Sequence, residues 1–413
     1  MLRDHDLVCL SITPWETRLP SSGHYLMREF ARHNRVLWVD HPATLKDGWT
    51  FRRDPAWRDR LARTWGRQVG LRRVPDPQRE VWVLTPPPMV PSGLPRPLYD
   101  WGLEASAALV RRCIRRAMQR LEMREPIFWV SFDVPLGERL AGTLGERMTV
   151  YHCFDEITGE PYIARHGARL ERALMDKSEV VFTTSPALQA SRGALHPRCH
   201  YVPNGVDYAH YARAGDPREA VPEELARLPG PVIGYLGNLE ARFDYDLIQA
   251  CAEARPGWSW VLVGPVQGAY AARIEALSRL PNVHVLGPCP AHRAPGTLKV
   301  FDVGLIPFVS SVQTRAIYPL KLNEYLAAGL PVVMTPFAAL DEVASSCRVA
   351  EGAPAYLAAI ERSLGEHSRE HREARMALAR AHDWSERALE MGRILVPRLI
   401  AQNARMLSGG TPR

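Results

Sequence analysis

The hydrophobic residues of this chain gather in short, nearly continuous runs that are separated by stretches with helical periodicity. The first two runs are LVCLSIT (7–13) and VLWVDHP (36–42), and a helical pattern lies between them over 23–33. Continuous apolar runs of this length are typical of strands buried on both faces, as in parallel sheets whose crossover connections are helices. The pattern therefore predicts an α/β fold.

The same alternation continues to residue 207 and starts again at residue 231. The segment between these points is rich in Pro, Glu and Ala and contains no strand-like run. We therefore expect two doubly wound domains, a linker between them, and a C-terminal helix that packs back toward the N-terminal domain. The expected boundaries are 1–207 for the N-terminal domain, 208–230 for the linker, 231–383 for the C-terminal domain and 384–413 for the last helix.

The composition is that of an ordinary globular protein, with 46% hydrophobic and 23% charged residues. No run of about 18 apolar residues occurs, so we expect no membrane-spanning helix. The start, MLRDHDLVCLSITPW, carries charges where a signal peptide needs an apolar segment, which predicts a cytoplasmic protein. The seven cysteines are widely spaced and form no CxxC pair, which argues against a disulfide framework and against structural zinc.

The positive charge of the chain is concentrated in one segment. Residues 46–124 contain 17 Lys or Arg against 8 Asp or Glu, whereas the whole chain has a net charge of +7. This segment includes Trp49, Trp57 and Trp65 among arginines and a basic amphipathic helix over 103–124. These features predict peripheral contact with an anionic membrane surface, but the helix pattern also fits a helix packed on its own sheet. Nucleic acid is not an expected partner, because no helix-turn-helix, zinc finger or aromatic-stacking motif is present.

The strongest candidate for chemistry is the segment YPLKLNEYLAAGLPVV (318–333). Pro319 suits the first turn of a helix, and Gly329 is typical of a helix end. Lys321 and Glu324 share one face near the N-terminus of this helix, where the free N–H groups attract an anion such as a diphosphate. Glu324 can accept hydrogen bonds from two ribose hydroxyls. The spacing alone also fits a solvated Lys/Glu pair on an amphipathic helix.

This segment resembles the donor-nucleotide helix of the GT-B glycosyltransferases, and of glycosyltransferase family 4 in particular, whose pattern is P-x-K-x-x-E-Y-x-A-x-G-x-P-V-V. Other segments are similar to parts of the same family. They are VPNGVD (202–207), IGYLGNLEARFDYDLI, FDVGLIPF, VYHCFDEITG and SGHYL. Together they look most like the bacterial subgroup of teichuronic-acid-biosynthesis glycosyltransferases.

The resemblance implies the GT-B fold, in which two Rossmann-like doubly wound domains face a central cleft. It implies an enzyme that moves a sugar from a nucleotide-diphosphate sugar to a cell-envelope polysaccharide or a lipid-linked acceptor. Such enzymes generally need no metal and no further cofactor, because helix N–H groups and basic side chains neutralise the diphosphate.

The donor side of the implied site contains Tyr318, Lys321 and Glu324 from the helix and further residues from the loop after IGYLG. Gly237 lets the backbone approach a ligand, and Arg242 can clamp the diphosphate, although it also fits a surface arginine. The DYD triplet that starts at Asp244 has the form of a DxD metal motif. We expect an N-cap there instead, because the triplet stands directly before a predicted helix.

The acceptor side of the implied site lies in the N-terminal domain. Asp155, after the strand MTVYHCF, is the candidate general base for the acceptor hydroxyl, and its neighbour Glu156 is a candidate for binding sugar hydroxyls. An aspartate at this place also fits a cap of the following turn. In the loop after the first strand, Trp15 can stack on a sugar ring, and Gly23 and His24 can contact the acceptor, while His24 also fits polar surface.

One position departs from the family pattern. Family 4 enzymes often carry a second glutamate eight residues before the ribose-binding one, and this chain has Ala316 there. The substitution leaves the transferred sugar and the stereochemistry open, and it admits a non-catalytic GT-B-like scaffold as an alternative function. A nicotinamide oxidoreductase is disfavoured, because no G-x-G-x-x-G follows a predicted strand.

Overall fold

The computed structural model describes residues 2–17, 20–44, 70–76, 78–89, 94–159, 163, 165–340 and 346–407. The chain divides into two compact units, each with its own sheet. Unit 1 consists of Met1–Val202 and Arg387–Arg413, and unit 2 consists of Pro203–Glu386. The segment 208–230, which the sequence presents as a linker, lies inside unit 2 and begins with the short helix α8 (Tyr208–Tyr211).

Unit 1 is built on an eight-stranded sheet with the order β3-β4-β2-β1-β5-β6-β7-β8. All neighbours pair in parallel except β3 and β4, which are antiparallel. The order changes direction at β1, which has β2 on one side and β5 on the other. The strands are β1 (Asp6–Ser11), β2 (Arg35–Asp40), β3 (Leu71–Arg73), β4 (Glu80–Leu84), β5 (Ile127–Ser131), β6 (Met148–Cys153), β7 (Val180–Thr183) and β8 (Cys199–Tyr201).

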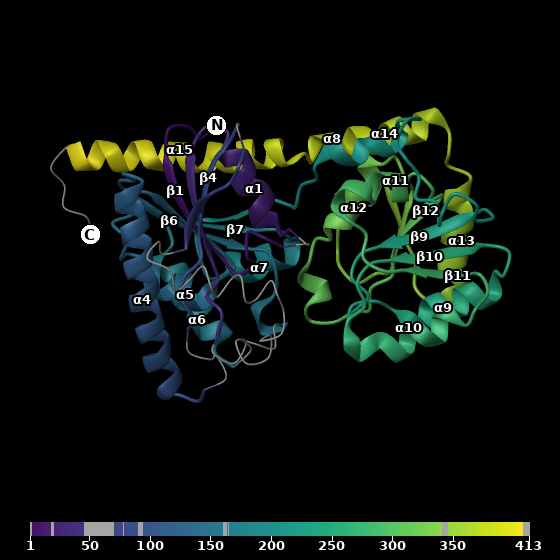
Figure 1. The fold of residues 1–413 in the computed structure, drawn as a ribbon, viewed down its shortest axis with the longest axis horizontal. Helices are drawn as coiled ribbons and strands as arrows, with labels where there is room; N and C mark the ends of the chain where they lie inside the picture. The colour runs from purple at the N-terminus through teal and green to yellow at the C-terminus, as the bar shows by residue number, and fades with distance from the viewer. Residues whose placement is uncertain are drawn as a thin grey trace. The chain divides into compact units, whose positions relative to one another are not determined.

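Helices pack against this sheet, as the alternating pattern predicts (Figure 1). The C-terminal helix α15 (Trp384–Leu407) joins unit 1 from Arg387 onward and buries Leu395 and Leu399. The other helices among the described residues of unit 1 are α1 (Ser22–Phe30), α4 (Leu98–Arg120), α5 (Val134–Leu140), α6 (Gly167–Lys177) and α7 (Pro186–Gly193), with a 3₁₀ turn at Ile157–Gly159.

Unit 2 has a six-stranded parallel sheet with the order β11-β10-β9-β12-β13-β14. The order changes direction at β9, which has β10 on one side and β12 on the other. The strands are β9 (Val232–Leu236), β10 (Ser259–Val263), β11 (Val283–Leu286), β12 (Val303–Ile306), β13 (Val332–Met334) and β14 (Cys347–Val349). The remaining helices are α9 (Tyr245–Ala254), α10 (Ala271–Ser278), α11 (Ala294–Leu298), α12 (Leu320–Ala327), α13 (Ala353–Leu364) and α14 (Arg369–Ala381).

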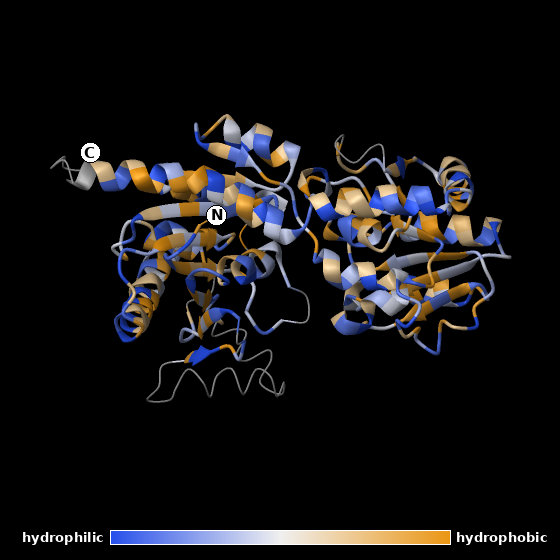
Figure 2. Cartoon of the chain, turned by 90° about the horizontal axis from the view of Figure 1, so that it is seen from above, coloured by the Kyte–Doolittle hydropathy of each residue, from blue (hydrophilic) through white to orange (hydrophobic). Residues whose placement is uncertain are grey.

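The strands of both sheets are predominantly hydrophobic, while the helices carry both hydrophobic and hydrophilic stripes (Figure 2). Trp38, Trp129 and Trp260 are fully buried strand residues that fill the space between sheet and helices. All seven cysteines are free thiols, and four of them are buried, as their scattered positions predict. The expected α/β architecture with two parallel-sheet domains is therefore confirmed.

The turn PNGV at the start of unit 2 is joined to the end of the same unit by backbone hydrogen bonds. Val206 accepts a hydrogen bond from the N–H of Trp384 at 3.1 Å and donates its own N–H to the carbonyl of His382 at 3.0 Å. A Cβ on Gly205 would lie 2.8 Å from the Trp384 ring and 2.9 Å from the His382 carbonyl. Glycine is therefore required where these two segments meet.

We predict that Gly205→Ala destabilises unit 2 by about 1–3 kcal/mol, because the added methyl group meets a backbone carbonyl and a packed indole. The melting temperature should fall by roughly 2–4 °C for each kcal/mol lost. Gly215→Ala is the matched control, since a Cβ there meets nothing within 4 Å. Equal melting temperatures for the two variants in differential scanning calorimetry would contradict this packing.

Candidate functional site

The predicted donor residues converge at the topological switch point of unit 2. Ligands of open α/β sheets bind at the carboxyl ends of the strands where the strand order reverses, which here lies between β9 and β12. Gly237 directly follows β9, and α12 is the first α-helix after β12. Lys321 and Glu324 lie on α12, and both side chains are half-buried.

Lys321 is held close to the backbone at the end of β9. Its ammonium lies 5.0 Å from the ring centroid of Tyr235 and 4.7 Å from that of Phe308. A Cβ on Gly237 would be 2.8 Å from the Lys321 Cε, so only glycine allows this approach without displacing the lysine. Burial, together with the positive charge of Arg242, lowers the pKa of Lys321 to about 8. The lysine is therefore a cation that gains from an added negative charge.

Glu324 is held by a neighbouring hydroxyl. Tyr211, the last residue of α8, hydrogen-bonds to its carboxylate. Burial raises the pKa of Glu324, and the Tyr211 hydrogen bond and the charge of Lys321 act in the opposite direction. The carboxylate thus sits inside the fold, one turn along α12 from the lysine, rather than in bulk solvent.

The N-terminus of α12 is left open for an anion. Pro319 occupies the N-cap position, and among the described residues no side chain caps the helix and no acidic residue lies in its first turn. The helix is fixed to the end of β9 because the Tyr325 hydroxyl accepts a hydrogen bond from the N–H of Leu236 at 2.8 Å. Lys321 lies in the first turn of α12, at the positive end of the helix dipole.

Arg242 and Asp244 lie in the loop that follows β9. The Arg242 Nε donates a hydrogen bond of 2.6 Å to the Glu240 carboxylate, and the side chain is half-buried. Asp244 caps α9, since its Oδ1 accepts a hydrogen bond from the N–H of Leu247 at 3.0 Å. The expected N-cap is therefore confirmed. In the described part of the chain, no group of three or more His, Cys, Asp or Glu side chains is placed to hold a metal.

Tyr318 is a buried residue that supports the site through hydrogen bonds. It is 2% exposed, and its hydroxyl donates to the Asn323 Oδ1 at 3.2 Å. Its carbonyl accepts a hydrogen bond of 2.7 Å from the Asn204 side chain, while Asn323 donates to the Asn204 carbonyl at 2.8 Å. These bonds tie the start of unit 2 to α12. The Tyr318 ring is thus a structural element, which differs from the direct donor contact that the sequence led us to expect. Ala316 is likewise buried.

Three of the predicted acceptor residues are buried in the interior of unit 1. Trp15 packs edge-on against Trp38 with 5.2 Å between ring centroids, and it is 8% exposed. His24 is completely buried. Its Nε2 is 3.0 Å from the Pro14 carbonyl and its Nδ1 accepts from the Ser21 N–H, while burial lowers its pKa to about 4. A Cβ on Gly23 would be 2.3 Å from the Ser131 hydroxyl. These residues position α1 and do not present side chains to a sugar.

Glu156 is committed to an ion pair. Arg192 donates to both of its carboxylate oxygens, at 2.6 and 3.0 Å, and the same guanidinium pairs with Glu171 at 2.9 Å. Although burial opposes it, Arg192 holds the pKa of Glu156 below its usual range. Its carboxylate therefore braces α7 against the loop after β6, a role different from the expected contact with sugar hydroxyls.

Asp155 stays a candidate at the carboxyl edge of the unit 1 sheet. It follows β6 by two residues and is half-buried. Its Oδ1 accepts a hydrogen bond from the N–H of Glu156 at 2.9 Å, so the carboxylate also orders its own turn.

The sequence analysis missed two residues at the switch point of unit 1. His41 directly follows β2, and Asp133 follows β5 by two residues. The His41 Nδ1 lies 2.7 Å from the Asp133 Oδ2. Polar residues directly after buried strands were the available signal, but the two positions are 92 residues apart, and only the sheet order brings them together.

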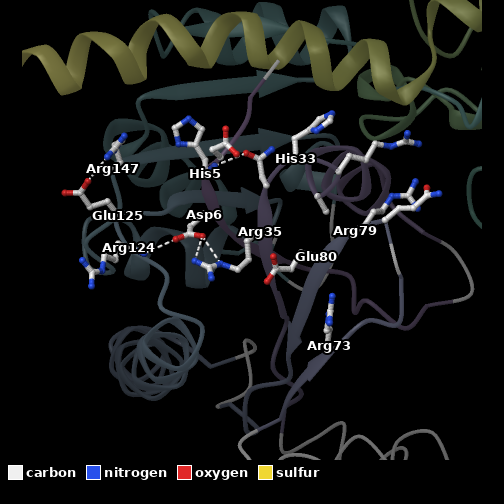
Figure 3. Close-up of a pocket in the computed structure, with 15 residues that line it drawn as sticks. His5, Asp6, His33, Arg35, Arg73, Arg79, Glu80, Arg124, Glu125 and Arg147 are labelled. Atoms are coloured by element: carbon white, nitrogen blue, oxygen red, sulfur yellow. Dashed lines mark hydrogen bonds and ion pairs between the residues drawn. The ribbon is translucent and has the colours of Figure 1, made fainter.

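A hollow of about 650 Å³ lies at the opposite, amino-terminal edge of the same sheet (Figure 3). Asp6, Arg35 and Glu80, the first residues of their strands, are among those that line it. Arg35 pairs with Asp6 at 2.8 Å, and Arg147 pairs with Glu125 at 2.7 Å (Figure 3). Because ligands of such sheets bind at the other edge, we do not regard this hollow as the reaction site.

Comparison with known proteins agrees with the geometry of unit 2. Residues 230–366, about a third of the chain, match the family model described as "Glycosyl transferases group 1". A curated relative from Bacillus subtilis (strain 168), named "Putative teichuronic acid biosynthesis glycosyltransferase TuaH", is 32% identical over 194 residues. That match covers 46% of this chain and 48% of the relative, so the chain spans about half the length of the curated relative that it matches.

Solved structures with a similar fold cover nearly the whole chain. Sucrose-phosphate synthase from Thermosynechococcus elongatus gives a TM-score of 0.68 at 16% identity over 96% of this chain and 99% of its own. Anabaena Alr3699/HepE in complex with UDP gives a TM-score of 0.65 at 16% identity over 95% of this chain and 100% of its own. The trehalose-phosphate synthase of Burkholderia vietnamiensis gives a TM-score of 0.66 at 14% identity over 97% of this chain and 100% of its own. The chain therefore has the GT-B fold, and its residues 230–366 match the model of the group 1 glycosyl transferases.

Proposed function

We propose that this protein is a glycosyltransferase that moves a sugar from a nucleotide-diphosphate sugar to a hydroxyl of a cell-envelope saccharide or a lipid-linked acceptor. The observation that carries the proposal is the placement of Lys321 and Glu324 at the switch point of unit 2, beside the uncapped start of α12. An ammonium and free N–H groups suit a diphosphate, and a carboxylate one turn further along suits the ribose hydroxyls. The group 1 match over the same residues supports this assignment.

In this proposal the leaving group is stabilised by the protein alone. As the sugar departs, negative charge grows on the diphosphate, and preorganised donors stabilise such charge without reorganisation. Lys321 and the N–H groups of α12 supply this stabilisation, and Arg242 adds a second cation by exchanging part of its contact with Glu240 for a phosphate oxygen. We therefore propose a metal-independent transfer.

The relatives support a choice of probes. Alr3699/HepE was solved with UDP and with UDP-glucose, so uridine nucleotides are the first ligands to test on this chain. The name of the Bacillus subtilis relative points to teichuronic acid biosynthesis, which supports a cell-envelope polysaccharide as the acceptor class.

On the acceptor side, Asp155 is the general base that the family resemblance implies. The alternative is a scaffold that binds a nucleotide but does not turn it over, which Ala316 favours because it removes a carboxylate from the donor side. Slow hydrolysis of one nucleotide sugar by the pure protein distinguishes an enzyme from such a scaffold.

We also propose that α4 contacts an anionic membrane surface. Leu98, Trp101 and Leu109 lie on its outward face, with Trp101 70% exposed. Arg112 and Arg116 are exposed further along the helix. Apolar anchors followed by arginines are typical of helices that lie in the headgroup region. Among the described helices, none has the length and apolar content needed to cross a bilayer.

The tryptophans at 49, 57 and 65, which the sequence analysis assigned to the same surface, lie outside the described residues.

We predict that Lys321→Ala and Glu324→Ala each abolish the thermal stabilisation that UDP gives the wild-type protein. Saturating ligand at about 100 times its Kd contributes about 2.7 kcal/mol, which is measurable as a shift in melting temperature. Arg279→Ala and Glu275→Ala are matched controls, because these residues form an exposed ion pair of 3.1 Å at the C-terminal end of α10. Unchanged UDP affinity in both Lys321→Ala and Glu324→Ala refutes the assignment.

The affinity for UDP should fall as the pH rises past about 8. The free protein loses the Lys321 proton with a pKa of about 8, and a bound diphosphate favours the charged form, so binding above this pH takes up a proton. From pH 7 to pH 9 we expect a loss of roughly tenfold in affinity by titration calorimetry. Lys321→Arg should flatten this dependence, because arginine stays charged. A wild-type affinity that does not change across this range contradicts a role for the ammonium.

Arg112→Ser combined with Arg116→Ser should weaken binding to vesicles that contain phosphatidylglycerol by roughly 30-fold, since each arginine near an anionic surface contributes about 1 kcal/mol. Vesicle flotation measures this, with zwitterionic phosphatidylcholine vesicles as the reference. Arg279→Ser, which removes an exposed arginine from unit 2, should leave binding unchanged. Equal flotation of wild type and the double variant argues against the α4 surface.

A further inference from the structure

The hollow at the amino-terminal edge of the unit 1 sheet has a polar and charged lining (Figure 3). Its volume of about 650 Å³ falls in the usual range of small-ligand sites, roughly 300–1,000 Å³. Among the described residues that line it, Ala31 is the only apolar one, and arginine is the most frequent type. An apolar ligand would bury little apolar area there. The hollow therefore suits a ligand that is charged and polar along its whole length.

The topology of the sheet arranges charged residues in a row along this hollow. The strands follow one another in the order β3-β4-β2-β1-β5, and β3 runs antiparallel to its neighbour, so its last residue lies where the others begin. In that order the lining residues at the strand ends are Arg73, Glu80, Arg35, Asp6 and Arg124. We call these five residues the edge row. Cations and carboxylates alternate along it.

The two ends of the edge row carry cations that the protein leaves without a described partner. In the middle, Arg35 pairs with Asp6 at 2.8 Å. Arg73 and Arg124 are exposed, and neither guanidinium forms an ion pair with a described residue. Four strand spacings of about 4.8 Å separate β3 from β5, which places these two ends roughly 19 Å apart along the edge. One small anion cannot reach both, whereas an extended ligand with several anionic groups can.

The backbone around the hollow is held in unusual conformations. Of the four non-glycine residues with positive φ in the described part of the chain, Asp4 (+58°) and Glu125 (+42°) line the hollow. A third, Glu122 (+53°), accepts a hydrogen bond of 3.4 Å from Arg35 through its carbonyl. Side chains adopt such φ values where the surrounding structure fixes the turn, and such turns concentrate at functional sites. The edge row therefore sits on a backbone whose shape is set in advance.

The alternation of charges favours one class of ligand. Guanidinium groups form bidentate hydrogen bonds with carboxylates and with phosphates. A polyphosphate carries a negative charge at every repeat, and Asp4 and Glu80, which pair with no described cation, would repel it. A chain of acidic sugars carries hydroxyls beside each carboxylate, and carboxylates such as that of Glu80 accept hydrogen bonds from hydroxyls. An acidic oligosaccharide therefore matches both kinds of group in the edge row.

We propose that this hollow binds an oligosaccharide that carries several carboxylates, with Arg73 and Arg124 on two of its carboxylates and Glu80 on a hydroxyl. The inference rests on the glycosyltransferase function proposed above and deepens it, because it makes the acceptor an acidic polymer. Every residue of this contact belongs to unit 1. A second contact of this kind raises the overall avidity for a polymer without changing the reaction site.

The test uses oligogalacturonides of two and eight units as probes of the full chain in titration calorimetry at low ionic strength. The octamer should bind roughly tenfold tighter than the dimer or better, because only the octamer reaches both ends of the edge row. Its affinity should fall as salt is added, since the contacts are exposed ion pairs. Maltooctaose, which has the same number of sugar units but no charge, should show no binding.

Arg73→Ala and Arg124→Ala should each lower the affinity for the octamer by roughly fivefold, the upper range for an exposed ion pair. The double variant should lose roughly 25-fold, because contacts this far apart contribute additively. Arg172→Ala is the matched control, since Arg172 is an exposed arginine of the same unit that pairs with Asp176 at 3.3 Å away from the hollow. All of these variants should keep the wild-type melting temperature and the wild-type stabilisation by UDP, which shows that they fold.

Three results overturn the inference while leaving the proposed function intact. One is equal affinity of the wild type and the double variant for the octamer. Another is a dimer that binds as tightly as the octamer, which contradicts a contact at both ends. The third is a polyphosphate of eight units that binds more tightly than the octamer and loses affinity in the same double variant, which assigns the hollow to phosphate ligands. A wild-type protein that binds the octamer but not UDP overturns the proposed function, and with it the role of the saccharide as acceptor.

Discussion

The close approach between α12 and the end of β9 is the constraint on which the candidate site depends. Gly237 has no side chain, so the Lys321 ammonium can lie against the backbone there, between the rings of Tyr235 and Phe308. The hydrogen bond from the Leu236 N–H to the Tyr325 hydroxyl holds the helix at this distance. The Lys321 ammonium is partly desolvated and lies in the first turn of a helix whose N-terminus has no side-chain cap. A diphosphate bound there would be stabilised by both positive charges, and it would in turn stabilise the buried ammonium.

The two units share one feature of sheet topology. In each, the strand order reverses beside the first strand, and the polar residues that the hydrophobic pattern does not explain stand after the strands next to the reversal. In unit 2 these residues lie on α12, whereas in unit 1 they are His41 and Asp133. The amino-terminal edge of unit 1 also carries many charges, but several of them pair with one another, as Arg35 does with Asp6.

Hydrophobic periodicity and helix-capping residues correctly predicted the features that depend on residues close together in the sequence. The parallel strands, the helix that carries Lys321, and the Asp244 cap follow from periodicity and capping rules and appear in the structure. Burial of individual side chains in loops could not be predicted this way. His24 was expected to meet a sugar but bonds Pro14, and Glu156 is taken by Arg192, which is 36 residues away. The His41 pair escaped notice because its members meet only through the strand order.

The most direct test of the account is a crystal structure of the protein with UDP. The account predicts the diphosphate within hydrogen-bond distance of the Lys321 Nζ and of the first N–H groups of α12, and the ribose hydroxyls on the Glu324 carboxylate. A nucleotide bound away from α12, for example in the arginine-lined hollow at the amino-terminal edge of unit 1, would contradict it.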